Sequence, residues 1–246
     1  MDFRVFGPLG VTHAGATVTV GRRKCRTLLA LLIGHHPHGL SPEVLADALW
    51  PDAEPAKAAN NLRVHVTYLR RSLADEPDVI PRTAGRYALA VARDAIDTCR
   101  FESAVLAARA TAASGDPRAA IDGFELAFEE RRGDPYADLR DLDALRAEIV
   151  RLEELRLDAI EGYATALLDD DRADQACRVL EPVVNANLTR EMLAARLMLA
   201  LYRTGRQQDS LALFGRVKAA LAEDLGLLPS DELQRLVDAI VVQRPE

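Results

Sequence analysis

A repeat in the second half of the chain restricts its fold more than any other feature. The aligned copies are SGDPRAAIDGFELA (114–127), DDRADQACRVLEPV (170–183) and TGRQQDSLALFGRV (204–217). In each copy a turn is followed by a small residue, a large apolar residue and a small or medium residue. These positions hold Ala120, Phe124 and Ala127, then Ala176, Leu180 and Val183, then Ser210, Phe214 and Val217. The second and third copies are offset by 34 residues, which is the period of tetratricopeptide helix pairs.

In such repeats the small residue lets two helices approach closely, and the large residue fills the gap between pairs. The first two copies are offset by 56 residues, so an insertion separates them. It holds RRGDPYADLRDLD and the start of a long charged helix near 141–168. We therefore predict an all-α, TPR-like helical repeat domain over 95–246, whose concave face suits a peptide, another protein or a partner domain. A plain helical bundle is the alternative.

The first 94 residues have a different pattern. DFRVFG and ATVTVG are rich in β-branched and aromatic residues, which predicts strands. Helices are predicted over 23–34, from Ser41-Pro42 to Trp50, and near 56–73. The second begins at Ser41-Pro42 because a serine before a proline is a common helix start. VIPRTAGRYALAV has two short strand patterns around a glycine, which predicts a β-hairpin. Three helices followed by a hairpin predict a winged helix-turn-helix domain over 1–94, so the fold class is mainly α with small β elements.

The charge is divided unequally between these two parts. Residues 1–94 hold 12 lysines and arginines against 9 acids, a net charge of +3, whereas residues 95–246 hold 19 against 29, a net charge of −10. The overall charge of −7 is therefore an average of unlike halves. Such asymmetry indicates a module that binds a polyanion, joined to an acidic module with other partners.

The predicted third helix has two unlike faces. Leu62, Val66, Leu69 and Leu73 form an apolar stripe at helical spacing. The remaining positions hold residues suited to DNA: Lys57, Asn60, Asn61, Arg63, Val64, Thr67, Tyr68, Arg70 and Arg71. No carboxylate occurs between Lys57 and Ala74, although an ordinary solvated helix mixes charges of both signs. A solvated polar face is the alternative interpretation.

The chemistry of these side chains fits the major groove. Asparagine and arginine form bidentate hydrogen bonds with adenine and guanine edges, and valine and the threonine methyl group can meet a thymine methyl group. Arg70 and Arg71 lie late in the helix, where contact with phosphate is expected. In the hairpin, Arg82, Thr83 and Arg86 surround a glycine and suit the minor groove or the backbone.

The sequence gives no sign of an enzyme. It has no Walker loop, GxSxG, HExxH or CxxC motif, so we expect no catalytic residue and no cofactor. The histidines of His35-His36-Pro37-His38 follow a helix end, where they can interact with the last carbonyls, so we expect no metal site. Cys25, Cys99 and Cys177 are too far apart for a disulfide framework and fit a reducing cytoplasm. No signal peptide or membrane span is expected.

Longer stretches of the chain resemble a known family. GPLGVTHAGATVTVGRRKCRTLLALLI, LADALWPDAEPAKAANNLRVHVTYLRRSL and RTAGRYALAV resemble the OmpR-type DNA-binding domain of the SARP (AfsR/SARP-type) regulators. From about Asp97 onward, GDPYADL, RLEELRLDAIE and MLALYRTGRQQDSLALF resemble their bacterial transcriptional activation domain (BTAD). The resemblance covers essentially the whole chain in the family's order.

The resemblance implies a transcriptional activator in the cytoplasm, associated with the nucleoid. It would bind direct repeats in promoter DNA as tandem protomers, which form a homodimer on the DNA. It would also recruit RNA polymerase holoenzyme and regulate antibiotic biosynthesis. The recognition helix falls on 56–73 and the wing on 79–91, and Trp50 would rest on a phosphate. Tyr68 stands where a basic residue is common in the family, and Arg63 where an uncharged polar one is common. The alternative is a protein-interaction scaffold or anti-activator whose DNA-binding domain is weak or vestigial.

Overall fold

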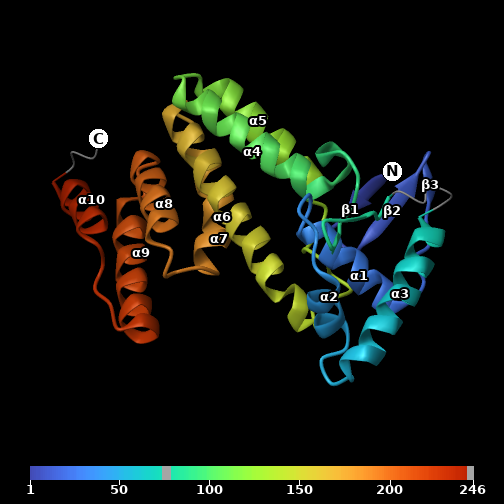
Figure 1. The fold of residues 1–246 in the computed structure, drawn as a ribbon. Helices are drawn as coiled ribbons and strands as arrows, with labels where there is room; N and C mark the ends of the chain where they lie inside the picture. The colour runs from blue at the N-terminus through green and yellow to red at the C-terminus, as the bar shows by residue number, and fades with distance from the viewer. Residues whose placement is uncertain (74–78, 243–246) are drawn as a thin grey trace. The chain divides into compact units, whose positions relative to one another are not determined.

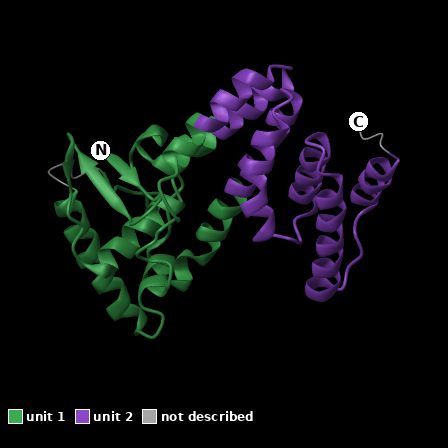
Figure 2. Ribbon diagram, turned by 180° about the vertical axis from the view of Figure 1, so that it is seen from behind, with its two compact units in different colours: residues 1–104, 126–155 green, residues 105–125, 156–246 purple. Residues whose placement is uncertain are grey.

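The structure is a computed structural model that describes residues 1–73 and 79–242. It contains two compact units, coloured separately in Figure 2. The first comprises residues 1–104 and 126–155, and the second comprises residues 105–125 and the chain from 156 onward. The division runs through three helices, α4 (Asp97–Ala113), α5 (Pro117–Glu130) and α6 (Arg146–Asp169). Part of the helical region therefore belongs to the same compact unit as the N-terminal residues. The predicted domain boundary between residues 94 and 95 stays a prediction.

The first unit begins with a three-stranded antiparallel sheet. Its strands are β1 (Asp2–Arg4), β2 (Gly10–His13) and β3 (Ala16–Thr17), in that order. Phe3 pairs with Val11 across β1 and β2. Ala14 and Gly15 join β2 to β3 with φ values of 48° and 80°, the left-handed conformation that a two-residue hairpin turn requires. Strand β2 was not predicted, because GVTH offers a single strongly apolar residue and depends on its neighbours for pairing.

Three helices and a hairpin follow the sheet. They are α1 (Arg23–Gly34), α2 (Pro42–Leu49), α3 (Pro55–Ser72) and the strands β4 (Arg82–Thr83) and β5 (Arg86–Tyr87). The hydroxyl oxygen of Ser41 accepts a hydrogen bond from the Val44 N–H at 3.3 Å, as expected of an N-cap. In Figure 1 α3 lies beside α1 and the sheet, and leucines from all three helices fill the core between them. The winged helix-turn-helix prediction is confirmed in its elements and their order.

Part of the predicted insertion packs into this same unit. The segment between α5 and the short helix η2 (Asp143–Leu145) runs along the N-terminal strand region. The Gly7 N–H donates to the Asp134 carbonyl at 3.0 Å, and the Tyr136 N–H donates to the Val5 carbonyl at 2.9 Å. The Tyr136 side chain is completely buried. The core of the first unit is therefore built from residues that lie more than a hundred positions apart.

The second unit is entirely helical among its described residues. Besides parts of α4, α5 and α6 it contains α7 (Ala173–Asn185), α8 (Glu191–Arg203), α9 (Gln207–Ala220), a π-helical turn η3 (Leu221–Leu225) and α10 (Asp231–Val241). Helices α7, α8 and α9 pack in succession (Figure 1). This arrangement confirms the TPR-like prediction.

The repeat positions are buried with two exceptions. The small residues Ala120, Ala176 and Ser210 are fully buried, and the Ser210 hydroxyl donates to the Met198 carbonyl at 3.0 Å. Phe214 and Val183, however, are half-buried, and their neighbours Leu213 and Val184 occupy the core. The expectation for these two residues was wrong by one position, since helical spacing alone leaves the rotation of a helix uncertain by about one residue.

No helix of the described residues is both long enough and apolar enough to cross a membrane.

Candidate nucleic-acid interface

Helix α3 is fixed in the first unit by its apolar stripe. Ala58, Leu62, Val66 and Leu69 are buried against α1 and α2. His65 lies beside this stripe, where its Nδ1 is 2.8 Å from the Asn61 carbonyl and its ring meets the Trp50 ring edge-on at 5.0 Å. These contacts determine which face of the helix points to water.

The opposite face brings together most of the predicted DNA-binding residues. The exposed members are Lys57, Asn60, Arg63, Val64, Thr67, Tyr68 and Arg71, while Asn61 is half-buried. Val64 is 44% exposed and Tyr68 is 38% exposed, so both side chains are accessible to a partner on this face. The Thr67 hydroxyl donates to the Arg63 carbonyl at 2.9 Å. Its hydrogen is thereby held within the helix.

The described residues supply no counter-charge to this face. Within residues 1–73 and 79–242, no acceptor or carboxylate lies within bonding distance of the Lys57, Arg63 or Arg71 side chains. Elsewhere in the same unit arginines are commonly paired, as Arg93 is with Glu102 at 2.8 Å. The exposed face of α3 is consequently a positively charged surface with hydrogen-bond donors directed to solvent.

Arg70 differs from the other predicted DNA-binding arginines of α3, because its side chain is hydrogen-bonded within the protein. Its Nε and Nη2 atoms donate to the Ile80 carbonyl at 3.1 and 2.6 Å. The side chain is half-buried and joins the end of α3 to the segment that precedes the hairpin. Arg70 therefore holds the wing in place, and its predicted contact with phosphate stays a prediction.

The hairpin presents its predicted residues to solvent. Ala84 and Gly85 form the turn with φ values of 50° and 79°. Arg82, Thr83 and Arg86 are exposed on either side of it, and the Arg86 Nη1 also donates to the Gly39 carbonyl at 3.2 Å. Tyr87 is buried, and its backbone exchanges two 2.9 Å hydrogen bonds with Leu40. The base of the wing is thus hydrogen-bonded to the rest of the unit, while its tip is exposed.

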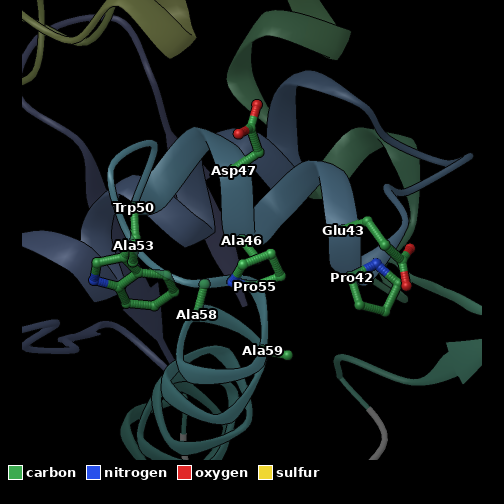
Figure 3. A pocket seen from close by; sticks show the side chains of 9 residues that line it. All are labelled: Pro42, Glu43, Ala46, Asp47, Trp50, Ala53, Pro55, Ala58 and Ala59. Atoms are coloured by element: carbon green, nitrogen blue, oxygen red, sulfur yellow. The ribbon is translucent and has the colours of Figure 1, made fainter.

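Trp50 lies at the end of α2, on the wall of a pocket of about 270 Å³ between α2 and the start of α3 (Figure 3). The lining is mainly alanine and proline, and its charged members are Glu43 and Asp47. A pocket with carboxylates and no basic lining residue is unsuited to a phosphate group. Because this side of the ring faces carboxylates, Trp50 could meet a phosphate group only on its other side. The indole also lies 6.0 Å from the Lys24 ammonium group.

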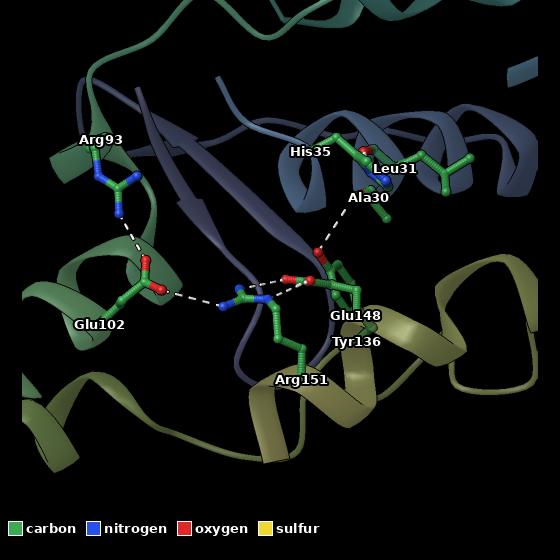
Figure 4. A network of polar contacts seen from close by, with 8 residues as sticks. All are labelled: Ala30, Leu31, His35, Arg93, Glu102, Tyr136, Glu148 and Arg151. Carbon is green, nitrogen blue, oxygen red and sulfur yellow. Dashed lines mark hydrogen bonds and ion pairs between the residues drawn. The ribbon is translucent and has the colours of Figure 1, made fainter. Parts of the chain in front are cut away.

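A network of ion pairs braces the segment that follows the wing (Figure 4). Arg93 donates to Glu102 at 2.8 Å, and Arg151 donates to Glu102 at 3.4 Å and to Glu148 at 2.8 and 2.9 Å. Beside it the Tyr136 hydroxyl donates to the Ala30 carbonyl of α1 at 3.4 Å. The network thereby joins the post-wing segment to α4 and α6.

Asp97 attaches the same region to the first strand. Its carboxylate accepts hydrogen bonds from the N–H groups of Val5 at 2.9 Å, Phe6 at 3.0 Å and Thr98 at 2.8 Å. Burial raises the pKa of Asp97 to about 6, although these N–H donors act to lower it. Asp97 is thus a structural carboxylate, and sequence reasoning did not identify it.

The histidine and cysteine predictions concern residues outside this surface. His35 Nδ1 lies 2.9 Å from the Leu31 carbonyl, as expected of a helix end. His36 Nε2 lies instead 3.0 Å from the Val91 carbonyl, which belongs to the segment after the hairpin. No cluster of three or more potential metal ligands occurs in the part of the chain that the structure describes. The cysteines are free thiols, and burial raises the pKa of each.

Arg22 is a member of this surface that sequence reasoning missed. Its guanidinium group lies over the Tyr68 ring at 4.1 Å from the centroid. The basic run GRRKCR was visible in the sequence, but the contact joins residues 46 positions apart. No local pattern indicates that Arg22 extends the surface of α3.

Comparisons with known proteins agree with this architecture. Residues 96–241 match the family described as "Bacterial transcriptional activator domain", and residues 17–86 match "Transcriptional regulatory protein, C terminal". The chain is 32% identical over its whole length to the regulatory protein AfsR of Streptomyces coelicolor, of which it covers 24%. It is 29% identical to the regulatory protein DnrI of Streptomyces peucetius and covers 93% of that protein.

A solved structure is also similar. That of Mycobacterium tuberculosis EmbR in complex with a low affinity phosphopeptide has a TM-score of 0.93 and 31% identity, and the match covers all of this chain and 66% of that one. The chain therefore spans less than two thirds of EmbR and about a quarter of AfsR. The match to the activator domain includes more than half of the chain's residues, and the match to the regulatory-protein domain precedes it. The chain therefore belongs to the SARP family of transcriptional regulators.

Proposed function

We propose that this protein binds double-stranded promoter DNA through its winged helix and activates transcription. The observation that supports the proposal most strongly is the exposed face of α3, which combines asparagine, arginine, valine and threonine with cations that no described residue neutralises. A helix of about 10 Å diameter fits the major groove of B-DNA. The apolar stripe of α3 leaves this face available.

The proposal gives the side chains distinct roles. Asn60 and Arg63 would read base edges, because their planar groups form paired hydrogen bonds with adenine and guanine. Val64 and the methyl group of Thr67 would meet thymine methyl groups. Arg71, near the end of α3, would bind phosphate.

The wing and the end of α2 would add contacts with the DNA backbone. Arg82, Thr83 and Arg86 border an open hairpin tip, which suits the minor groove or adjacent phosphates. Trp50, which is half-buried, would rest on a phosphate. Contacts of this kind orient the domain without selecting a sequence.

The second unit would supply the activating contact. Its stacked helices form the type of surface that holds another protein, and we propose RNA polymerase holoenzyme as that partner. Two protomers would occupy direct repeats upstream of a promoter, and the regulated genes would belong to a secondary-metabolite pathway. The names of the relatives, which are regulatory and transcriptional regulatory proteins, support the class of function.

The test is binding of the purified protein to its own upstream DNA and to a scrambled duplex at several salt concentrations. Specific regulators prefer their site by roughly a thousandfold or more. We expect that preference in the native chain and its loss in the Arg63→Ala, Arg71→Ala double variant. A matched control replaces Arg178 and Arg235, exposed arginines of α7 and α10, with alanine. It removes the same charge and should bind like the native chain.

Equal, weak binding of both duplexes by the native chain, with no effect of the double variant, would contradict the proposal. The protein would then act as an interaction scaffold or anti-activator, and its helical repeats should be tested against protein partners.

A further inference from the structure

The start of α1 places a guanidinium group against α3. Arg22 is the residue before α1, and its backbone is extended, with φ −93° and ψ 132°. The group lies 4.1 Å from the centroid of the Tyr68 ring. Both side chains are exposed, so the pair forms part of the same surface as the open face of α3.

The other cations of this basic run are engaged within the protein. Arg23 is paired with Asp141, and the Lys24 ammonium group donates to the Leu49 carbonyl. Arg26 Nε donates to Asp138 at 3.0 Å. Arg22 differs, because the described parts of the chain offer its guanidinium group an aromatic ring and no acceptor.

Stacking holds a guanidinium group by its face and leaves its edge free. The N–H donors of arginine lie in the plane of the group, so a ring against one face does not occupy them. Such an edge matches two oxygens of a phosphate group and can donate two parallel hydrogen bonds to them. A guanidinium group held in this way at the border of a DNA-reading helix is oriented for a phosphate of the strand beside the groove.

We propose that Arg22 is a DNA phosphate contact and that Tyr68 is its positioning residue rather than a reader of bases. The inference rests on the proposed DNA-binding function. Tyr68 is thereby given a different role from the base-reading residues of α3. The guanidinium group of Arg22 covers one face of the Tyr68 ring, so the nucleic acid would meet the guanidinium group and not that face of the ring. The Tyr68 hydroxyl has no part in this role.

The experiment measures binding of the full chain to its upstream DNA and to a scrambled duplex, as a function of salt. Loss of one phosphate contact lowers the slope of log affinity against log salt by about 0.9. We expect Arg22→Ala to lower the slope by this amount on both duplexes and to leave their ratio of affinities unchanged. Arg178→Ala is the control for net charge and should leave the slope as it is in the native chain.

Variants of Tyr68 test the positioning role. Tyr68→Phe keeps the ring and should bind like the native chain. Tyr68→Ala should weaken binding to both duplexes equally, but should have no further effect when Arg22 is already alanine. Such loss of effect in the double variant identifies residues that act as a unit.

The outcomes separate the two proposals. An unchanged slope in Arg22→Ala, while the native chain prefers its upstream DNA, would overturn the phosphate contact and leave the proposed function standing. A change in the ratio of affinities caused by Tyr68→Ala in the Arg22→Ala background would show that Tyr68 reads bases. If the native chain shows no preference, the sequence-specific function fails, and the slope on the scrambled duplex still decides the role of Arg22. Absence of binding to either duplex would overturn both proposals.

Discussion

The start of α1 and the open face of α3 are both rich in arginine, yet the protein treats them differently. At α1, the side chains of Arg23 and Arg26 meet the carboxylates of Asp141 and Asp138. Those acids come from the segment that packs along the N-terminal strand region, more than a hundred residues later in the chain. Arginine at α1 therefore serves mainly to join two parts of one unit.

On the open face of α3 the same residue type lies exposed. Arg63 and Arg71 are exposed, and the described residues supply neither with a carboxylate. A solvated guanidinium group needs no partner for stability, so its exposure costs nothing. A count of arginines therefore does not by itself indicate a surface for a polyanion. What distinguishes the two places is that described carboxylates pair with the arginines of α1, and none pairs with Arg63 or Arg71.

Truncation of the side chain that anchors the acid-bearing segment should have the largest effect on stability. Tyr136 is completely buried, and its backbone N–H donates to Val5. We expect Tyr136→Ala to lower the free energy of unfolding by about 3–5 kcal/mol, because truncation of a large buried aromatic leaves a cavity. Urea denaturation of the full chain, followed by circular dichroism, measures the change.

Tyr136→Phe is the matched control. It removes a single 3.4 Å hydrogen bond to Ala30 and keeps the ring, so it should cost about 1 kcal/mol. A similar, small cost for both variants would mean that the segment is not part of the core, and the pairing at α1 would be incidental.

The next largest effect concerns pH. Burial raises the pKa of Asp97 to about 6, above its value in the unfolded chain. Between about pH 4 and pH 6 the folded state keeps a proton that the unfolded state has lost, so the contribution of Asp97 to stability falls as pH rises. The full decrease is about 3 kcal/mol and is complete above pH 6.

Asp97→Asn removes this ionisation and provides the reference. The unfolding free energy of the native chain, minus that of the variant, should decrease between pH 4 and pH 6.5 and then remain constant. An increase over this range would show that the N–H donors of Val5, Phe6 and Thr98 outweigh burial. The attachment of the first strand would then resemble an ordinary ion-stabilised cap.

Two single substitutions distinguish the paired arginines of α1 from the exposed arginines of α3. Asp138→Ala deprives the Leu9 N–H of an acceptor at 2.8 Å and Arg26 of its carboxylate, so it should cost about 1.5–3 kcal/mol of stability. Arg71→Ala should change stability by less than about 0.5 kcal/mol. It should instead lower the salt slope of DNA binding by about 0.9, which Asp138→Ala should not. If the two variants affected both quantities alike, the distinction between paired and free arginines would have no functional meaning.

Local patterns were sufficient to predict the helices of the first unit. The stripe of α3 and the Ser41-Pro42 start of α2 depend on residues close in sequence, and both agree with the structure. The hairpin turn at Ala84 and Gly85 was predicted for the same reason. The exposed face of α3 followed from the stripe, since the two faces of one helix determine each other.

Features that depend on distant parts of the chain could not be predicted. The direction of Arg70 depends on where the Ile80 carbonyl lies, and the partner of Arg22 depends on how α1 packs beside α3. The position of Tyr136 depends on its hydrogen bond to the carbonyl of Val5, a residue 131 positions earlier in the chain. Each is a tertiary contact, and periodicity within one helix contains no information about it.

The smallest expected effect tests how far pairing at α1 depends on burial. The side chains of Arg23 and Asp141 are 57% and 69% exposed, and exposed ion pairs contribute about 0–1 kcal/mol. Asp141→Asn should therefore leave the unfolding free energy almost unchanged, in contrast to Asp138→Ala. It should also free Arg23, one residue from Arg22, and so strengthen DNA binding at low salt. Because such a contribution is screened, the gain should disappear near 1 M salt, where the Debye length is about 3 Å. A large loss of stability in Asp141→Asn would contradict the view that an exposed ion pair contributes little to the fold. The exposure of a pair would then not distinguish one that stabilises the unit from one that only lowers the surface charge beside α3.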